Sequence, residues 1–255
     1  MLRTDKAWEK FGSEEPYFGV LADRKFTAEN LHLNLDEFFA SGEGTVSQIL
    51  ARFEKHFGSL ARGRALDHGC GVGRLSLPLA MQFDRVVALD VSPSMLAEAR
   101  ENAARSRAAN LHFAIADDDL SQAAEEFDFV NSYMVLQHVR VRRGLAILSR
   151  LIRKVKPGGG FHIHISIRTD GKARRFVWWA SHHIPGVKIW QNIRAGRAWN
   201  APAMQMNNYP LNRVIQSMSV EGIGELLVAT ETHANFVTCS LTGRRPASNP
   251  IEGNR

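Results

Sequence analysis

Hydrophobic residues recur at helical spacing just before residue 60 and change to strand-like runs after it. Between residues 45 and 57 the apolar side chains stand three or four positions apart, which is typical of an amphipathic helix. These side chains are Val46, Ile49, Leu50, Phe53 and Phe57. Thr45 stands where an N-cap is expected, and Gly58 follows where a helix commonly ends. The pattern predicts a helix over residues 45–57.

From Arg64 onward the chain alternates between short apolar runs and helical patterns. Strands are predicted at 64–70, 85–90, 111–116, 127–134 and 161–167. Helices are predicted at 74–83, 92–106 and 142–155, the last ended by the glycines of 156–160. Ser92 and Pro93 are suited to the N-cap and first position of the second helix. This order predicts a parallel, doubly wound α/β sheet.

The two ends of the chain and one internal stretch depart from this rhythm. Residues 1–44 are predicted to be short helices and turns that form an N-terminal cap, and residues 45–168 to be a cofactor-binding core. Residues 169–208 are long for a connection and predict a lid or acceptor-binding insertion. Residues 209–245 predict a final helix and two strands joined by a turn at His233–Ala234. We expect one domain over residues 1–255.

Composition bears on the partners of this protein, on disulfides and on membrane spans, but does not specify a function. The net charge of +6 is compatible with nucleic acid or an acidic small molecule as partner, but the basic residues are dispersed. Two cysteines cannot form a disulfide framework, and no apolar run approaches a membrane span. The charged N-terminus lacks the apolar core of a signal peptide, so we expect a cytoplasmic protein.

The stretch "ALDHGCGVGRL", residues 65–75, places alternating glycines directly after the first predicted strand. A dinucleotide fingerprint requires a further glycine where this chain has Arg74, and a P-loop requires a Lys-Ser or Lys-Thr pair that is absent. Asp90 ends the next strand, where a carboxylate can accept both hydroxyls of a ribose. Asp117 and Asp118 follow the third strand and could accept from an adenine amine. These residues together favour an adenosine-containing ligand without a pyrophosphate.

Five segments in order resemble the successive motifs of the class I S-adenosylmethionine-dependent methyltransferases. They are "ALDHGCGVGRL", "VVALDVSPSMLAEAR", "AIADDDL", "FDFVNSYMVLQHV" and "KPGGGFHIHI", within residues 60–168. The resemblance implies a Rossmann-like methyltransferase fold, α/β and doubly wound, with a mainly parallel seven-stranded sheet, N-terminal helices and a lid insertion. It implies S-adenosylmethionine as cofactor and S-adenosylhomocysteine as product.

The resemblance also assigns roles to individual positions of this chain. Asp67, Gly69, Gly71 and Gly73 would surround the methionine part of the cofactor, and Asp90 would accept from the ribose hydroxyls. Val91 and Met95 would flank the adenine, and Asp117 or Asp118 would read its amine. Tyr133 and Met134 would lie beside the reacting methyl group. His68 stands where the family more often has an apolar residue, and "NSYM" at 131–134 lacks the Asn-Pro-Pro-Tyr form of members that methylate DNA amino groups or glutamine.

Several polar and aromatic residues are candidates for acceptor chemistry, each with a structural alternative. His138 follows the fourth strand and is the candidate general base, with a structural or cofactor-contacting role equally open. Tyr17, Trp178, Trp179, His182 and His183 are candidates for acceptor binding. His162 and His164 alternate on one face of a strand, which favours structural histidines over a metal site, and we expect no metal.

The sequence therefore predicts methyl transfer to an oxygen or nitrogen of a small-molecule or glycan-like acceptor. Two alternatives stay open at this point: an RNA methyltransferase, favoured by the basic charge, and a non-catalytic protein that binds the cofactor. The oligomeric state and the identity of the acceptor are not specified by these patterns.

Overall fold

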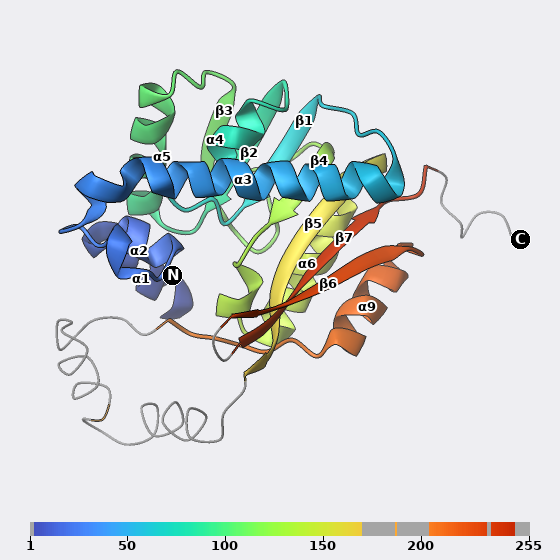
Figure 1. The fold of residues 1–255 in the computed structure, drawn as a ribbon. Coiled ribbons are helices and arrows are strands. Elements are labelled where there is room, and N and C mark those ends of the chain that lie inside the picture. The colour runs from blue at the N-terminus through green and yellow to red at the C-terminus, as the bar shows by residue number, and fades with distance from the viewer. Residues whose placement is uncertain (1–2, 170–186, 188–203, 234–235, 248–255) are drawn as a thin grey trace, which may run out of the picture.

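The computed structural model describes residues 3–169, 187, 204–233 and 236–247. Its centre is a seven-stranded sheet of order β3-β2-β1-β4-β5-β7-β6. The strands are β1 (Arg64–His68), β2 (Arg85–Asp90), β3 (Leu111–Ile115), β4 (Phe127–Ser132), β5 (Val155–Thr169), β6 (Leu226–His233) and β7 (Phe236–Arg244). The first five strands pair in parallel, whereas β7 is antiparallel to both β5 and β6. The mainly parallel, doubly wound sheet predicted from the sequence is confirmed (Figure 1).

Helices cover both faces of the sheet. On one face, α3 (Leu31–Phe57) and α4 (Ser76–Ala80) pack on Ala65, Val86 and Phe129, and α5 (Pro93–Arg105) packs on Ala88. On the other face, α6 (Val141–Arg153) and α9 (Leu211–Val220) pack on the larger apolar cluster. The buried strand residues of that cluster are Leu66, Val87, Leu89, Phe127, Val130, Val155, Phe161, Ile163, Ile165, Cys239 and Leu241. None of the helices in the described part of the chain is long and apolar enough to cross a membrane.

The helix predicted over residues 45–57 begins earlier than its sequence signal indicated. α3 starts at Leu31, so Thr45 lies inside the helix, where its hydroxyl donates to the carbonyl of Ser41 at 2.7 Å. The N-cap role predicted for Thr45 and the helix start predicted there are therefore wrong, because a mid-helix threonine can satisfy its hydroxyl within the helix. The predicted end is confirmed, with Gly58 at φ 77°.

Other boundaries differ by a few residues. α4 is shorter than the predicted helix 74–83, and α6 ends at Arg153, so the glycine run 156–160 belongs to β5. Gly160 lies within van der Waals reach of the Phe53 ring of α3, and a Cβ there would collide with that ring. The prediction for α5 is confirmed: the hydroxyl of Ser92 accepts from the Met95 amide, and Pro93 is the first helical residue.

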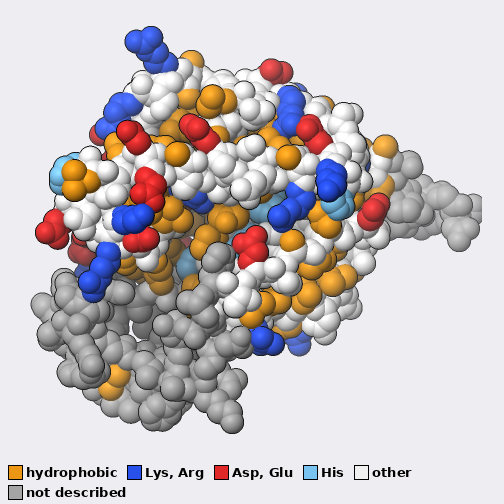
Figure 2. Space-filling view, viewed as in Figure 1, with side chains coloured by type: hydrophobic (Ala, Val, Ile, Leu, Met, Phe, Trp, Pro, Cys, Tyr) orange, Lys and Arg blue, Asp and Glu red, His pale blue; other side chains and the backbone are white. Residues whose placement is uncertain are grey.

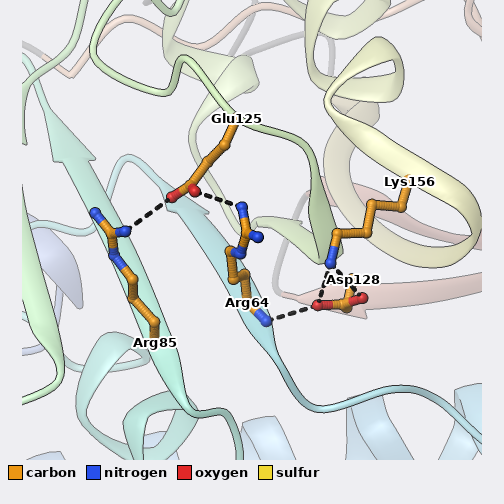
Figure 3. Close-up of polar contacts among 5 residues, drawn as sticks. All are labelled: Arg64, Arg85, Glu125, Asp128 and Lys156. Carbon is orange, nitrogen blue, oxygen red and sulfur yellow. Dashed lines mark hydrogen bonds and ion pairs between the residues drawn. The ribbon is translucent and has the colours of Figure 1, made fainter.

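An ion-pair network fixes the amino ends of β1, β2 and β4 at the edge away from the glycine turn (Figure 3). Glu125 lies 2.5 Å from Nη1 of Arg64 and 3.5 Å from Nη1 of Arg85. Asp128 accepts from Lys156 at 2.9 Å and from the backbone amide of Arg64 at 2.7 Å. These contacts tie the starts of neighbouring strands together and so help to set their register.

The N-terminal cap consists of α1 (Arg3–Glu14), α2 (Pro16–Val20) and a short 3₁₀ turn, η1 (Arg24–Phe26). Figure 1 places α1 and α2 beside α5, near one end of α3. A small apolar cluster holds them there, with Phe11, Tyr17 and Phe26 of the cap against Phe38 of α3 and Met95 of α5.

Tyr209, just before α9, anchors the segment that carries η2 (Leu136–His138). Its side chain is fully buried, and its Oη lies 2.8 Å from the carbonyl oxygen of Leu136 and 2.9 Å from that of Val139.

We predict that Tyr209→Phe lowers the free energy of unfolding by about 1–3 kcal/mol, because two buried carbonyls lose their donor. Urea titration measures this.

The matched control is Tyr133→Phe, whose hydroxyl makes no hydrogen bond with the residues that the structure describes. Equal stability losses in Tyr209→Phe and Tyr133→Phe would contradict the anchoring role.

Candidate functional site

The glycine turn after β1 is the first part of the candidate site. Gly69, Gly71 and Gly73 have φ values of 74°, 54° and 88°, a region that residues with side chains rarely adopt. A Cβ at Gly69 would collide with Val135, and one at Gly71 would lie 2.7 Å from Val20 of the cap. Glycine is required here both by the backbone path and by the closeness of its neighbours.

Asp90 ties this turn to the start of α5. Its Oδ2 accepts from the Gly71 amide and its Oδ1 from the Ser92 amide, both at 2.9 Å. Burial, with the nearby charge of Asp67, raises the pKa of Asp90 to about 6 in spite of these backbone hydrogen bonds. Because each carboxylate oxygen can accept more than one hydrogen bond, Asp90 keeps acceptor capacity beyond the two amides.

Asp67 lies beneath the turn and belongs to a buried polar chain that crosses three strands. Its Oδ2 accepts from Ser76 at 2.6 Å, and its Oδ1 accepts from the Asn131 amide nitrogen at 2.8 Å. Oδ1 of Asn131 in turn lies 3.1 Å from Nδ1 of His162, so that this nitrogen is the donor. Burial raises the pKa of Asp67, partly offset by these hydrogen bonds. Asp67 therefore supports the turn from below.

The two acidic candidates after β3 have different surroundings. Asp117 is exposed and accepts from the backbone amide of Ser121 at 3.0 Å and from its hydroxyl. Asp118 accepts two hydrogen bonds from Nε of Arg143 at 2.9 Å, and Arg143 also lies 3.1 Å from Asp5 of α1. The structure thus commits Asp118 to an arginine and leaves Asp117 at the open end of β3.

Helix α1 lies over the carboxyl edge of the sheet. Glu9 accepts from the hydroxyls of Ser92 and Ser94 at 2.7 and 2.6 Å, at the N-terminus of α5. The ring of Trp8 meets that of His138 edge-on with centroids 4.8 Å apart. A carboxylate at a helix N-terminus is favourable because it faces unpaired amides and the positive end of the helix dipole. No local pattern in the sequence indicated that Trp8 and Glu9 would reach these positions.

The residues predicted to flank the adenine are partly covered by this cap. Met95 is buried against Phe11, and a Cβ at Gly12 of α1 or at Gly19 of α2 would approach its side chain to 3.0 Å. Val91 is half-buried next to Asp90. The structure therefore brings Val91, Met95 and Asp90 together at the start of α5.

Tyr133 and Met134 directly follow β4, which ends at Ser132, two residues before the end of the predicted strand 127–134. Met134 has a φ of 60°, a strained conformation of the kind that clusters at functional sites. The Tyr133 ring lies 4.8 Å from that of His164 and 5.9 Å from that of His162, and the Arg74 guanidinium lies 5.6 Å from the Tyr133 centroid. Nothing in the sequence indicated that Arg74, Tyr133 and His164 would meet, although the alternation of "FHIHISI" indicated a polar face on this strand.

His138, the candidate general base, is buried at the end of η2. Its Nδ1 lies 2.7 Å from the carbonyl oxygen of Gln205, which fixes the proton on Nδ1 and leaves Nε2 as the basic nitrogen. Nε2 lies 3.4 Å from the side-chain nitrogen of Gln137. Burial lowers the pKa of His138 to about 4, so its imidazole is neutral at physiological pH.

Of the five residues predicted to bind the methyl acceptor, one is buried in the N-terminal cap and four lie outside the described residues. Tyr17 is buried in the cap, where its Oη lies 2.8 Å from Glu98 and 3.0 Å from Asn102 of α5. Its hydroxyl holds α2 on α5, and the acceptor-binding role of Tyr17 stays a prediction. Trp178, Trp179, His182 and His183 fall outside the described part of the chain. Within that part, no cluster of three or more His, Cys, Asp or Glu residues is arranged to hold a metal.

The sequence matches known methyltransferases over its central part. The family model for a methyltransferase domain matches residues 65–159. The chain is 31% identical over 115 residues to the ubiquinone biosynthesis O-methyltransferase of Hydrogenovibrio crunogenus, covering 45% of this chain and 47% of that protein. It is 35% identical over 115 residues to the 23S rRNA (uracil(1939)-C(5))-methyltransferase RlmD of Shewanella amazonensis, covering 45% and 25%. The chain thus spans less than half the length of these curated relatives.

Solved structures extend the likeness to nearly the whole fold. The magnesium protoporphyrin IX methyltransferase ChlM from Synechocystis PCC 6803 with bound SAM has a TM-score of 0.61 and 15% sequence identity, covering 96% of this chain and 98% of that one. At this identity the likeness concerns the fold alone. The glycine turn, Asp90 at the end of β2, the strand order and the family match together identify residues 65–159 as a methyltransferase domain of the class I S-adenosylmethionine-dependent type.

Proposed function

We propose that this protein transfers the methyl group of S-adenosylmethionine to an oxygen or nitrogen of a small-molecule acceptor and releases S-adenosylhomocysteine. The observation that carries the proposal is the junction of the glycine turn and Asp90 at the carboxyl edge of β1 and β2. In open α/β sheets, ligands bind outside the carboxyl ends of the strands at such a switch point.

The residues at this junction fit the cofactor. Gly69, Gly71 and Gly73 lack a Cβ atom, which permits the positive φ angles of the turn and lets a ligand approach its backbone. Asp90 retains acceptor capacity for a ribose diol. Asp117, which has no arginine partner among the described residues, is the better placed of the two acidic candidates to accept from the adenine amine. Val91 and Met95 supply apolar contact beside Asp90.

The chain's own residues have two tasks in the transfer. When bound, the cofactor supplies a methyl group activated by its positively charged sulfur. The protein must hold the acceptor atom in line with it at about 3 to 3.5 Å, and must accept a proton if the acceptor is neutral. Tyr133 and the strained Met134 define where the acceptor approaches, and Trp8 of α1 shields His138 from water. Nε2 of the neutral His138 is the proposed proton acceptor.

Asp90 should control cofactor affinity and its dependence on pH. Since burial raises its pKa to about 6, the carboxylate form needed for binding is present above that pH and is lost below it. We predict that the affinity for S-adenosylhomocysteine is flat near pH 7 and falls by up to about tenfold per unit below about pH 6. Asp90→Asn should weaken binding by about 1.5–3 kcal/mol, because hydrogen bonds to a charged group are lost, and should flatten the pH dependence.

Isothermal titration calorimetry measures both effects, with NAD as the control ligand. Asp84→Asn, the same change at an exposed position, is the matched control and should leave the affinity unchanged. Unaltered affinity in Asp90→Asn, or tight binding of NAD, would contradict the assignment.

His138 should affect turnover more than binding. His138→Gln keeps hydrogen-bonding groups but removes the basic nitrogen, so we predict a loss of about a hundredfold or more in kcat with the affinity for S-adenosylhomocysteine retained. Because the pKa of His138 is lowered to about 4, kcat at saturating cofactor should show no fall near 6.5, the usual histidine value.

Labelled methyl transfer into a metabolite extract gives the assay for His138, and His112→Gln at an exposed position is its control. A variant that loses cofactor affinity and turnover in equal proportion would make His138 a cofactor contact.

A second candidate function, methylation of RNA, has one structural observation in its favour. A surface hollow of about 560 Å³ is lined by Asp118, Asp119, Ala146 and four arginines: Arg140, Arg142, Arg143 and Arg150. Arg143 and Arg150 are ion-paired with the two acids, which leaves the exposed Arg140 and Arg142. We predict no micromolar binding to generic RNA. Binding that falls steeply with salt, and that Arg140→Ala/Arg142→Ala weakens, would favour the RNA function instead.

A further inference from the structure

The neighbouring strands β5 and β7 have one apolar and one polar face, and both faces are buried. Phe161, Ile163, Ile165, Cys239 and Leu241 point into the core under α6 and α9. On the other face lie His162, His164 and Ser166 of β5, directly opposite Thr242, Ser240 and Thr238 of β7. The side chains of all six of these polar residues are 6% exposed or less.

The polar face is the one on the side of α3. Gly160, His162 and His164 are two positions apart along β5 and therefore lie on the same face of the strand. Gly160 faces Phe53 of α3. Tyr133, which packs against the same α3 cluster, also lies against both histidine rings, stacked on His162 and tilted to His164. Figure 2 shows histidine and hydrophobic side chains set back below α3 on this side of the molecule.

Stability of the fold does not explain this row. Burying polar side chains is unfavourable unless they are hydrogen-bonded, and β-branched apolar residues suit a buried strand better. Some of the row is satisfied internally: Ser166 donates to Asn208 at 2.9 Å, and Thr238 lies 3.4 Å from the Glu231 carbonyl. The opposite faces of the same strands show that this chain uses apolar residues where packing alone decides.

Arg74 connects the row to the glycine turn and has an unused donor. It directly follows Gly73, is only 5% exposed, and lies against the Tyr133 ring. Its Nη1 donates to Ser41 of α3 at 3.2 Å, but its Nε, buried as well, has no hydrogen-bond partner among the residues that the structure describes. An unpaired buried donor of this kind is costly, and a ligand oxygen would satisfy it.

We propose that the polar face of β5 and β7, with Tyr133 and Arg74, binds the methyl acceptor, and that the acceptor is a neutral polyhydroxylated ring of the sugar class. The proposal rests on the proposed function, because it places the acceptor next to Tyr133 at the end of β4. It draws on β7, which the cofactor motifs do not include.

The chemistry of the row selects this class over others. Serine, threonine and tyrosine hydroxyls both donate and accept, as sugar hydroxyls do, and burial keeps His162 neutral with a pKa of about 3. A phosphorylated acceptor would call for several cations, since phosphate is recognised by clustered arginine and lysine. Arg74 brings one positive charge to the row, and its Nε suits one ring or hydroxyl oxygen. A wholly apolar acceptor would leave the row unsatisfied.

The experiment reads binding without using turnover. Methyl glycosides of glucose, galactose, mannose and rhamnose are titrated into the full chain with S-adenosylhomocysteine present, and imidazole nitrogen signals of His162 and His164 are followed by NMR. Methyl glucuronate and a simple phenol form the acidic and apolar arms. We expect at least one glycoside to shift both imidazole signals.

Thr238→Val and Ser240→Ala remove a hydroxyl each with little change of shape. Each should raise the dissociation constant or KM for that glycoside about tenfold, since a neutral hydrogen bond contributes about 1 kcal/mol or slightly more, while the affinity for S-adenosylhomocysteine is unchanged. Thr230→Val, the same kind of change on the other face of the same hairpin, is the control and should have no effect.

The outcomes separate this proposal from the one on which it rests. Failure to bind S-adenosylhomocysteine overturns the proposed function. Normal cofactor binding with no glycoside shift, a shift by the glucuronate or the phenol alone, or equal effects of Thr238→Val and Thr230→Val overturns the acceptor proposal and leaves the methyltransferase function standing.

Discussion

The two hydrogen bonds that the Asp90 carboxylate accepts from the backbone amides of Gly71 and Ser92 are the contacts on which the rest of the site depends. One buried carboxylate joins the glycine turn, the end of β2 and the start of α5. The same turn is held from its other side by Leu89, whose carbonyl accepts from the amides of Gly69 and Cys70 at 2.7 and 3.0 Å. Because these are backbone contacts, the shape of the turn is set before any ligand arrives, and preorganisation of this kind lowers the entropic cost of binding.

The N-terminal cap completes the site at this edge through polar contacts as much as through apolar ones. Asp5 pairs with Arg143, Glu9 accepts from the serines at the start of α5, and Thr4 lies 3.2 Å from Gln205, whose carbonyl accepts from His138. The cap thus connects the proposed adenine end of the site to the proposed base. An edge covered by protein excludes water, which strengthens electrostatic interactions within it.

The sheet itself is used asymmetrically. Its α6 and α9 side is an apolar core that supplies packing energy, whereas its α3 side changes from apolar at Ala65, Val86 and Phe129 to polar at β5 and β7. Tyr133 stands at this change, between the glycine turn through Arg74 and the polar row through His164. A single strand end therefore separates the part of the sheet assigned to the cofactor from the part proposed for the acceptor.

Local sequence determined much of this protein. The alternation of strands and helices, the positive-φ glycines, Ser92 at the N-cap and Gly58 at the end of α3 follow from short-range sterics and hydrogen bonding, and all were predictable. The placing of Asp90 at the end of β2 followed from the same parallel-strand pattern. These features depend on residues a few positions apart, where propensity and periodicity carry the information.

Only the tertiary structure decided what depends on contacts between distant segments. The sequence predicts Thr45 as the N-cap of a helix, yet α3 continues through it. The apolar residues before it, such as Phe38, are buried against α1 and α2 of the N-terminal cap. The sequence around Tyr17 does not indicate a partner for its hydroxyl, which in the structure forms a hydrogen bond with Glu98 of α5. Asp118 differs from Asp117 because it accepts a hydrogen bond from Arg143. The row formed by β5 and β7 exists only once an antiparallel hairpin from the end of the chain pairs with a strand that precedes it by some 70 positions. Such pairings are set by burial and geometry across the whole fold, which no local pattern specifies.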